Sequence, residues 1–336
     1  MTEVIIFNQK TYEKIFNFYS NEFRKIENKN PYAILMAKDY NTTITFFKNR
    51  KVMFQGENAY QLASYWKNSD NLLELTPPTD YPEEGEIIKD EVNDFKNSDK
   101  LYFSSSLGSD EVGKGSYLGP LIVTATYVNK EDIPLLEKLG VIDSKLLKNQ
   151  DIIKTAPYLI NMLEHESIIL SNEDYNSNSL FKDNNNNNIN INLVNSYLHN
   201  LVLTKLKEKL KEKNKNYDYI IMDQFVNSKN YYNYLKTIKD EKDKNLVITD
   251  NITFVTEGEK RNLAVSAASI ISRYLFLKEM AKLSQKYGFI INMGSGNEAT
   301  EDALKIVKKE GLNELQKIAK FNFNNTNNII KKLKEN

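Results

Sequence analysis

Two adjacent carboxylates, Asp110 and Glu111, stand at the centre of residues 102–128: Tyr-Phe-Ser-Ser-Ser-Leu-Gly-Ser-Asp-Glu-Val-Gly-Lys-Gly-Ser-Tyr-Leu-Gly-Pro-Leu-Ile-Val-Thr-Ala-Thr-Tyr-Val. The pattern predicts a strand that gives way to a Gly-Lys-Gly turn at residues 113–115, followed by a second strand in the apolar run 121–128. Side chains of neighbouring strand residues point to opposite faces. Both carboxylates can therefore serve one site only if the strand twists or ends here, and we expect it to end here.

The same stretch nearly fits a phosphate-binding loop of the form Gly-x4-Gly-Lys-Ser/Thr, from Gly108 to Lys114. Two features argue against that interpretation. Gly115 follows the lysine, so no hydroxyl group is placed for Mg²⁺, and two carboxylates inside the loop would repel phosphate. A plainer alternative is an acidic turn that caps a strand, and the rest of the chain weighs against it.

The composition narrows the chemistry to oxygen-based groups. The chain has 336 residues, enough for two domains, and Lys plus Arg equals Asp plus Glu at 45 each, so net charge gives no sign of a nucleic-acid partner. The absence of cysteine excludes disulfides and a thiol nucleophile. With only His165 and His199 present, a histidine-rich metal site is excluded. Carboxylates remain as the catalytic groups, and their oxygens suit Mg²⁺ or Mn²⁺.

Residues 1–75 predict a small α+β domain. Helical spacing in 9–29 and again in 58–66 flanks three short β-rich segments at 33–38, 42–48 and 51–55. Basic residues are interleaved with threonine and aromatic residues in these segments. Such a sheet face can follow a phosphate backbone, although a solvated sheet face fits these residues equally well. The lysines that would contact substrate are Lys38, Lys48 and Lys51.

Residues 76–100 change composition sharply. They are rich in acidic residues and contain Pro77, Pro78 and Pro82, which predicts a stiff linker between two domains. The second domain is then expected to span 101–336. An asparagine-rich stretch at 184–192 predicts a loop insertion within it, and we expect the lysine-rich end after Thr326 to be a frayed tail. No transmembrane run or signal peptide is visible, which predicts a cytoplasmic protein with no membrane partner.

From Lys100 onward, strands alternate with helices, which predicts an α/β core. Two further carboxylates fall at element ends. Asp223 closes the apolar strand 217–225, and Glu259 precedes a helix that begins at Leu263. Each could instead cap a helix. Four such carboxylates gathered together are what a two-metal phosphodiesterase needs, because two cations offset the charge and activate a water.

One further segment, Val141-Ile-Asp-Ser-Lys145, follows a glycine and precedes a helix-like stretch. Asp143 or Ser144 suits the position of a helix cap. Lys145 is then placed to meet a phosphate group. We therefore expect Ser144 and Lys145 to lie at the substrate side of the site.

The order and spacing of several motifs resemble bacterial ribonuclease HIII over nearly the whole chain. The amino-terminal segment around Ala37-Lys38 and Lys51-Val-Met-Phe-Gln-Gly56 also resembles that family's extra domain, which is similar to the TATA-binding protein. The matching motifs of the second domain are Gly108-Ser-Asp-Glu-Val-Gly-Lys-Gly115, Gly119-Pro120, Gly140-Val-Ile-Asp-Ser-Lys145, Met222-Asp-Gln-Phe225, Leu263-Ala-Val-Ser-Ala-Ala-Ser-Ile-Ile271, Gly294-Ser-Gly296 and Ala319-Lys320 with Asn325-Thr326.

The resemblance implies an RNase H-like fold, with a mixed sheet flanked by helices, and endonucleolytic cleavage of the RNA strand of RNA–DNA hybrids. The products would carry 5′-phosphate and 3′-hydroxyl ends, and the cofactor would be Mg²⁺ or Mn²⁺. It implies a monomer whose catalytic and metal-binding residues are Asp110, Glu111, Asp223 and Glu259. The backbone of Gly113, Lys114 and Gly115 would contact the RNA strand, where its amides can read the 2′-hydroxyl groups.

Three positions depart from the family pattern. Ser116 stands where an acidic residue is common, Lys260 replaces a small polar residue, and Asn322 replaces a histidine. The nearest rival function is that of ribonuclease HII, which cuts at single ribonucleotides in DNA; the extra domain and Glu259 argue against it. A catalytically silent hybrid-binding protein is the other alternative, and an intact set of four carboxylates argues against that.

Overall fold

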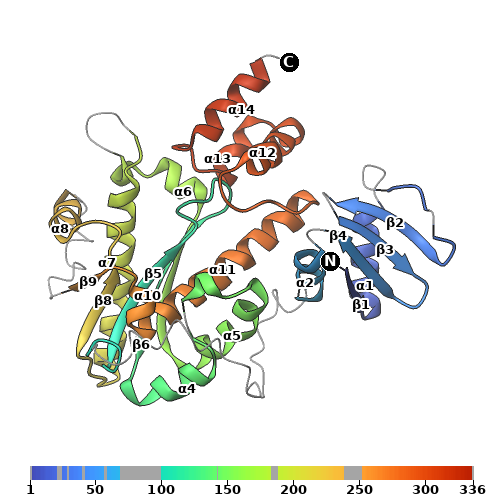
Figure 1. The fold of residues 1–336 in the computed structure, drawn as a ribbon. Helices are drawn as coiled ribbons and strands as arrows, with labels where there is room; N and C mark the ends of the chain where they lie inside the picture. Colours follow the sequence, from blue (N-terminus) through green and yellow to red (C-terminus); the bar gives the residue numbers. More distant parts are fainter. Residues whose placement is uncertain are drawn as a thin grey trace. The chain divides into compact units, whose positions relative to one another are not determined.

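A computed structural model describes residues 2–20, 25–28, 30–39, 42–56, 59–68, 100–141, 143–182, 188–237 and 252–334. The chain divides into two compact units, Met1–Thr76 and Pro77–Asn336 (Figure 1). Nearly all of the predicted linker 76–100, and residues 184–187 of the asparagine-rich stretch, lie outside the described residues. No helix of the described part is long and apolar enough to cross a membrane.

The first unit is an antiparallel sheet in the order β1-β4-β3-β2. Phe46 lies at its core, with the rings of Tyr12 and Tyr19 against it at 5.9 and 6.1 Å between centroids. The three predicted strands are confirmed and a fourth, β1, was not predicted. The elements are β1 (Thr2–Ile6), α1 (Gln9–Tyr19), β2 (Ala33–Asp39), β3 (Thr42–Phe47), β4 (Lys51–Gly56) and α2 (Ala59–Asn68).

The predicted helix 9–29 is too long. α1 ends at Tyr19, and Lys25 instead forms an isolated β-bridge with Ala37 at the sheet edge. In the sequence, Phe23 and Ile26 extend the helical spacing of apolar residues beyond Tyr19, which is why the prediction ran too far.

The second unit is built on a five-stranded mixed sheet in the order β7-β6-β5-β8-β9. β5 pairs antiparallel with β6 and parallel with β8, so it is the central strand. The predicted α/β core is therefore confirmed. The strands are β5 (Ser106–Val112), β6 (Leu121–Val128), β7 (Glu164–Leu170), β8 (Tyr219–Asp223) and β9 (Ile252–Val255).

Two long helices cover the two faces of this sheet (Figure 1). α11 (Leu263–Tyr287) lies so close to β5 that a Cβ atom on Gly108 would stand 2.3 Å from the backbone nitrogen of Val265. α7 (Ile191–Glu212) covers the other face with an apolar core that includes Leu198, Val202 and Leu206. The shorter helices before these two are η1 (Lys130–Asp132), α4 (Ile133–Lys138), η2 (Ser144–Leu146), α5 (Asn149–Met162), α6 (Asn172–Ser177) and η3 (Ser179–Phe181).

The carboxyl-terminal segment is helical to Lys334, so the predicted frayed tail after Thr326 is wrong. Asn325 and Thr326 begin this last helix by bonding to buried partners: Asn325 Nδ2 donates to Ser295 O at 3.0 Å, and Thr326 Oγ1 lies 3.1 Å from the hydroxyl of Tyr117. These tertiary contacts override the weak helix propensity of residues 324–328 at the start of this last helix. The remaining helices are α8 (Ser228–Thr237), α10 (Gly258–Arg261), α12 (Asn297–Glu310), α13 (Leu312–Ile318) and α14 (Asn324–Lys334).

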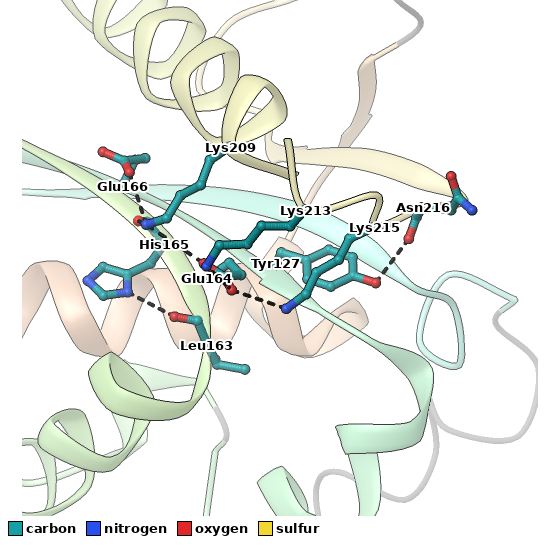
Figure 2. Close-up of polar contacts among 9 residues, drawn as sticks. All are labelled: Tyr127, Leu163, Glu164, His165, Glu166, Lys209, Lys213, Lys215 and Asn216. Atoms are coloured by element: carbon teal, nitrogen blue, oxygen red, sulfur yellow. Dashed lines mark hydrogen bonds and ion pairs between the residues drawn. The ribbon is translucent and has the colours of Figure 1, made fainter. Parts of the chain in front are cut away.

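An ion-pair cluster joins β7 to the end of α7 (Figure 2). Glu164 accepts from Lys213 at 2.7 Å and from Lys215 at 3.1 Å, and the hydroxyl of Tyr127 donates to Asn216 O. A cavity of about 340 Å³ opens beside these residues. Glu164 begins β7 and Tyr127 pairs with Leu107 near the start of β5, so the cluster lies at the opposite end of the sheet from Asp110 and Glu111.

Candidate active site

Asp110 and Glu111 lie near the end of β5, which gives way to the Gly-Lys-Gly turn after Val112 as predicted, but the pair itself still has regular strand geometry. Their side chains consequently take opposite faces of the sheet. Asp110 lies on the face of α11, where it bonds the hydroxyl of Ser269. Glu111 lies on the face of α7, where it meets His199. The regular alternation of a strand, with no bulge to interrupt it, is the cause.

Asp110 is buried among negative charges. Burial raises the pKa of its carboxyl group well above the usual range, and the neighbouring charges of Glu111 and Glu259 raise it further. The hydroxyl of Ser269 opposes this shift by bonding the ionised form. The position therefore lacks a positive charge, which a bound cation would supply.

Glu111 is surrounded by donors instead. Asn195 Nδ2 donates to its Oε1 at 3.2 Å, and His199 Nε2 lies 3.1 Å from its Oε2. Lys114 Nζ stands 3.8 Å from Oε1. Burial alone would raise the pKa of Glu111, but the hydrogen bond and charge of His199 together with the charge of Lys114 outweigh it and hold the pKa below its usual value. Glu111 is therefore an ionised carboxylate.

Asp223 ends β8 directly beside Asp110. The parallel pairing of Ser109 with Met222 places the next residue of each strand, Asp110 and Asp223, side by side. Oδ1 of Asp223 accepts the N–H of Gly258 at 2.9 Å, which joins the end of β8 to the start of α10. A helix-cap role is thus part of what this side chain does, and its second oxygen remains available.

Glu259 lies in the short helix α10 and is buried. Its Oε2 accepts the N–H of Ser144 at 2.7 Å, and its Oε1 stands 3.4 Å from Lys145 Nζ. Burial raises the pKa of Glu259, and the charge of Asp143 adds to this, while Ser144 and Lys145 oppose it. Ser144 and Lys145 are thus brought to the site. Lys145 projects outward, since its side chain is 78 % exposed.

The four carboxylates lie near the carboxyl-terminal ends of β5 and β8 and in α10. Although Asp110 and Glu111 take opposite faces, they are close enough for the charge of Glu111 to raise the pKa of Asp110. The oxygens of the four carboxylates are turned toward N–H and O–H donors, and in the described part of the chain no three histidine, aspartate or glutamate side chains stand close enough together to hold a cation. The donor set nevertheless suits a hard divalent cation, because it consists of carboxylate oxygens. A buried amide oxygen beside Glu111, Asn195 Oδ1, has no hydrogen-bond partner in the described structure.

The Gly-Lys-Gly turn adjoins Glu111. Gly113 has a φ of +95°, and a Cβ there would stand 2.2 Å from Pro120 O, so only glycine fits. Gly115 is exposed, and a Cβ at this position would have nothing within 4 Å of it. Lys114 Nζ lies 5.2 Å from the ring centre of Phe225, which keeps it on the side of Glu111. Position 113 of the turn therefore accepts only glycine, whereas position 115 has room for a side chain among the described residues.

The lysines predicted to bind substrate belong to the first unit. Lys38 and Lys48 are exposed and Lys51 is half-buried. Lys38 pairs with Thr43, and both lie on the face opposite Ala37 and Ile44, which are buried. That face also carries exposed apolar side chains, Val4 and Ile6.

The three departures have ordinary local partners. Ser116 is buried, and its hydroxyl donates to Leu118 O at 2.8 Å and accepts the N–H of Gly294. Lys260 pairs with the exposed Glu257 at 2.8 Å. Asn322 Oδ1 accepts the hydroxyl of Tyr175 at 3.1 Å. None of these contacts involves one of the four carboxylates.

Several site residues were not predicted. No role was predicted for the serines of α11, yet Ser269 bonds Asp110 and Ser144, and Ser266 Oγ donates to Glu259 O at 2.5 Å. Arg273 donates to Ser144 O and so supports the same loop. The available signal was the spacing of Ser266, Ser269 and Ser272, which places all three on one helical face.

The comparisons with known proteins agree with this architecture. A family model described as Ribonuclease HII matches residues 107–326, and one described as a domain of unknown function (DUF3378) matches residues 2–74. The crystal structure of Bst-RNase HIII in complex with Mn²⁺ matches with a TM-score of 0.63 and 28 % identity over 100 % of both chains. Ribonuclease H2 from Pyrococcus horikoshii OT3 shares the fold, with a TM-score of 0.54 and 22 % identity over 69 % of this chain and 100 % of its own. Fold and site together define a nuclease of the ribonuclease H class.

Two curated relatives identify the family within this class. The chain is 37 % identical over 305 residues to Ribonuclease HIII of Bacillus mycoides (strain KBAB4) and 36 % identical over 304 residues to Ribonuclease HIII of Bacillus cereus (strain AH187). Each alignment covers 90 % of both proteins. The chain belongs to the ribonuclease HIII family, which confirms the resemblance and the RNase H-like fold predicted from the sequence.

Proposed function

We propose that this chain cleaves the RNA strand of RNA–DNA hybrids endonucleolytically, leaving 5′-phosphate and 3′-hydroxyl ends, with Mg²⁺ or Mn²⁺ held by Asp110, Glu111, Asp223 and Glu259. The observation that carries the proposal is the backbone pairing that sets Asp110 beside Asp223, with Gly258 tying Asp223 to the helix of Glu259. Membership of the ribonuclease HIII family supports the substrate class. We further propose that the protein acts as a cytoplasmic monomer.

The chemistry divides between bound cations and the chain. Two divalent cations at these carboxylates would activate a water and stabilise the leaving oxygen. Ser144 N–H holds Glu259 in place, and the hydroxyl of Ser269 holds Asp110. We propose that Lys145, which is exposed and lies beside Glu259, contacts a phosphate of the substrate. The open backbone at Gly115 lets the RNA strand approach closely, where amides can read 2′-hydroxyl groups.

Substitution Asp110→Asn tests the assignment. It keeps the shape of the side chain but replaces a carboxylate oxygen that would hold a cation, so kcat for a continuous RNA–DNA hybrid should fall by orders of magnitude while hybrid binding and the fold are retained. Near-normal cleavage by this variant in Mg²⁺ would refute the role. The wild-type assay should include a duplex with one ribonucleotide. Equal or faster cleavage of that duplex would favour a ribonuclease HII-like activity. Cleavage of neither substrate would favour a silent binding protein.

A further inference from the structure

Glu111 is held by a helix on the far side of the strand that carries it. Asn195 and His199 are four residues apart on α7, so they share one helical face, and both are buried. Asn195 bonds Oε1 of Glu111, and His199 bonds Oε2. Each carboxylate oxygen therefore has its own partner from the same face of α7.

Buried polar side chains destabilise the fold when they lie without hydrogen-bond partners on a helix that otherwise packs apolar residues against a sheet. His199 avoids this cost, since its Nδ1 lies 2.9 Å from Ser109 Oγ and its ring lies 5.2 Å from that of Phe225. Asn195 does not avoid it, because its Oδ1 has no hydrogen-bond partner among the described residues. Packing alone gives no reason for an asparagine here.

The geometry explains why the pair is useful to a carboxylate ligand. An ionised carboxylate can accept about four contacts, two on each oxygen. Asn195 and His199 each contact a different oxygen, which fixes the plane of the carboxylate in which a cation would bind. Without them, Glu111 would keep the ion pair with Lys114, whose Nζ lies 3.8 Å from Oε1 on a partly exposed side chain. Partners of this kind around metal ligands orient the ligand and tune its affinity.

We propose that Asn195 and His199 are positioning residues that hold Glu111 in the orientation needed to bind a divalent cation. This inference rests on the proposed function, specifically on Glu111 as a cation ligand. Removing either partner frees Glu111 to turn, so affinity for the cation falls even when the fold is intact.

Asn195→Leu separates positioning from stability. Leucine has nearly the same shape and eliminates the unpartnered Oδ1, so the thermal stability of the full chain should be unchanged or higher. Affinity for Mn²⁺ alone, measured by electron paramagnetic resonance of free Mn²⁺, should nevertheless fall by about tenfold or more. His199→Phe, which keeps a ring against Phe225, should weaken Mn²⁺ binding similarly. In cleavage assays the half-saturating Mn²⁺ concentration should rise, while kcat at saturating Mn²⁺ recovers.

Asn200→Leu is the matched control. Asn200 is buried on the same helix, and its Nδ2 donates to the hydroxyl of Tyr231 at 3.2 Å. This variant should lose stability and keep wild-type Mn²⁺ affinity. His165→Phe changes the other histidine, which bonds Leu163 O, and should also leave Mn²⁺ affinity unchanged.

Glu111→Gln distinguishes failure of the inference from failure of the proposed function. If Glu111→Gln weakens Mn²⁺ binding while folded Asn195→Leu binds Mn²⁺ like the wild type, the positioning role is overturned and the ligand role of Glu111 stands. If Glu111→Gln leaves Mn²⁺ binding unchanged, the ligand role itself fails and the positioning role fails with it. Should His199→Phe not fold, Asn195→Leu decides the question alone.

Discussion

Lys320 occupies a completely buried position behind the Gly-Lys-Gly turn. Its Nζ donates to two backbone carbonyls, Ser116 O at 2.9 Å and Gly119 O at 2.5 Å, and in the described structure no carboxylate pairs with it. Burial lowers the pKa of this amine to about 7. The residue thus fixes the loop between β5 and β6 from the carboxyl-terminal side, with a charge that is only partly present at neutral pH.

The lowered pKa of Lys320 predicts how stability depends on pH. Between about pH 7 and the ordinary pKa of lysine near 10.5, the unfolded chain holds a proton that the folded chain has released. The free energy of unfolding should therefore rise with pH in this range, by up to about 1.4 kcal/mol per pH unit. Below pH 7 both states are protonated, and this contribution no longer varies.

Urea denaturation of the full chain between pH 7 and pH 9.5 measures this dependence. Lys320→Met should remove the increase, because methionine does not titrate. Lys317→Met is the control: Lys317 is about half-exposed and pairs with Glu314 near the surface, so the wild-type increase should persist. Equal pH dependence in the wild type and in Lys320→Met would show that Lys320 keeps its proton in the folded state.

At this scale the sequence offers the carboxylates as candidates but does not show what holds them. Asp110, Asp223 and Glu259 each lie beside an apolar strand, which is a local pattern visible in the chain. The donors to Glu111 come from residues 84 and 88 positions away, on α7. Long-range pairing of this kind has no signature in one sequence, because it depends on which helix covers which face of the sheet.

At the scale of elements, the contact between α11 and β5 positions the site. Gly108 faces the start of α11, and a Cβ there would stand 2.3 Å from Val265 N and 2.5 Å from Ala264 C. Both are backbone atoms, which cannot move aside without shifting the helix. Since α11 carries Ser269 and Ser272, which bond the side chain and backbone of Asp110, a displaced helix would also displace the carboxylate's support.

Gly108→Ala should therefore destabilise the fold by about 1–3 kcal/mol, the usual cost of overpacking a core. Chemical denaturation measures this change. Gly115→Ala is the control for stability, since nothing lies within 4 Å of its added Cβ, and its free energy of unfolding should change by less than about 0.5 kcal/mol. An equally stable Gly108→Ala would mean that α11 can move away from β5 at little cost.

α14 shows the limit of prediction for a whole element. Asn-Asn-Thr-Asn-Asn has weak helix propensity, and the lysine-rich end suggested fraying. Burial of Ile329 and the bonds from Asn325 to Ser295 and Thr300 instead fix the helix against α12. By contrast, β6 and the start of α11 follow strong apolar patterns and lie where the sequence predicted them.

At the scale of the whole molecule, we propose that catalysis and substrate binding are divided between the two units. All four carboxylates belong to the second unit, whose sheet has a core of its own. The first unit offers a sheet face where Lys38 and Thr43 accompany the exposed Val4 and Ile6. We propose that this face binds the hybrid, with lysines at phosphates and apolar side chains against the sugar and base edges.

The combined substitution Lys38→Gln and Lys48→Gln in the full chain tests this division of roles. Each lysine that neutralises a phosphate contributes about 0.9 to the slope of log affinity against log salt concentration, so losing both should flatten the slope by up to about 1.8 and weaken hybrid binding. The cleavage rate at saturating hybrid should remain close to that of the wild type, because every carboxylate and the Gly-Lys-Gly turn are untouched. Hybrid titrations at several salt concentrations, alongside single-turnover rates, give both quantities.

Lys67→Gln, at the exposed end of α2, is the control and should leave the salt slope unchanged. If the double variant keeps the wild-type affinity and slope, these lysines do not contact the backbone of the hybrid. If it binds normally but cuts slowly at saturation, the first unit contributes to the chemical step instead.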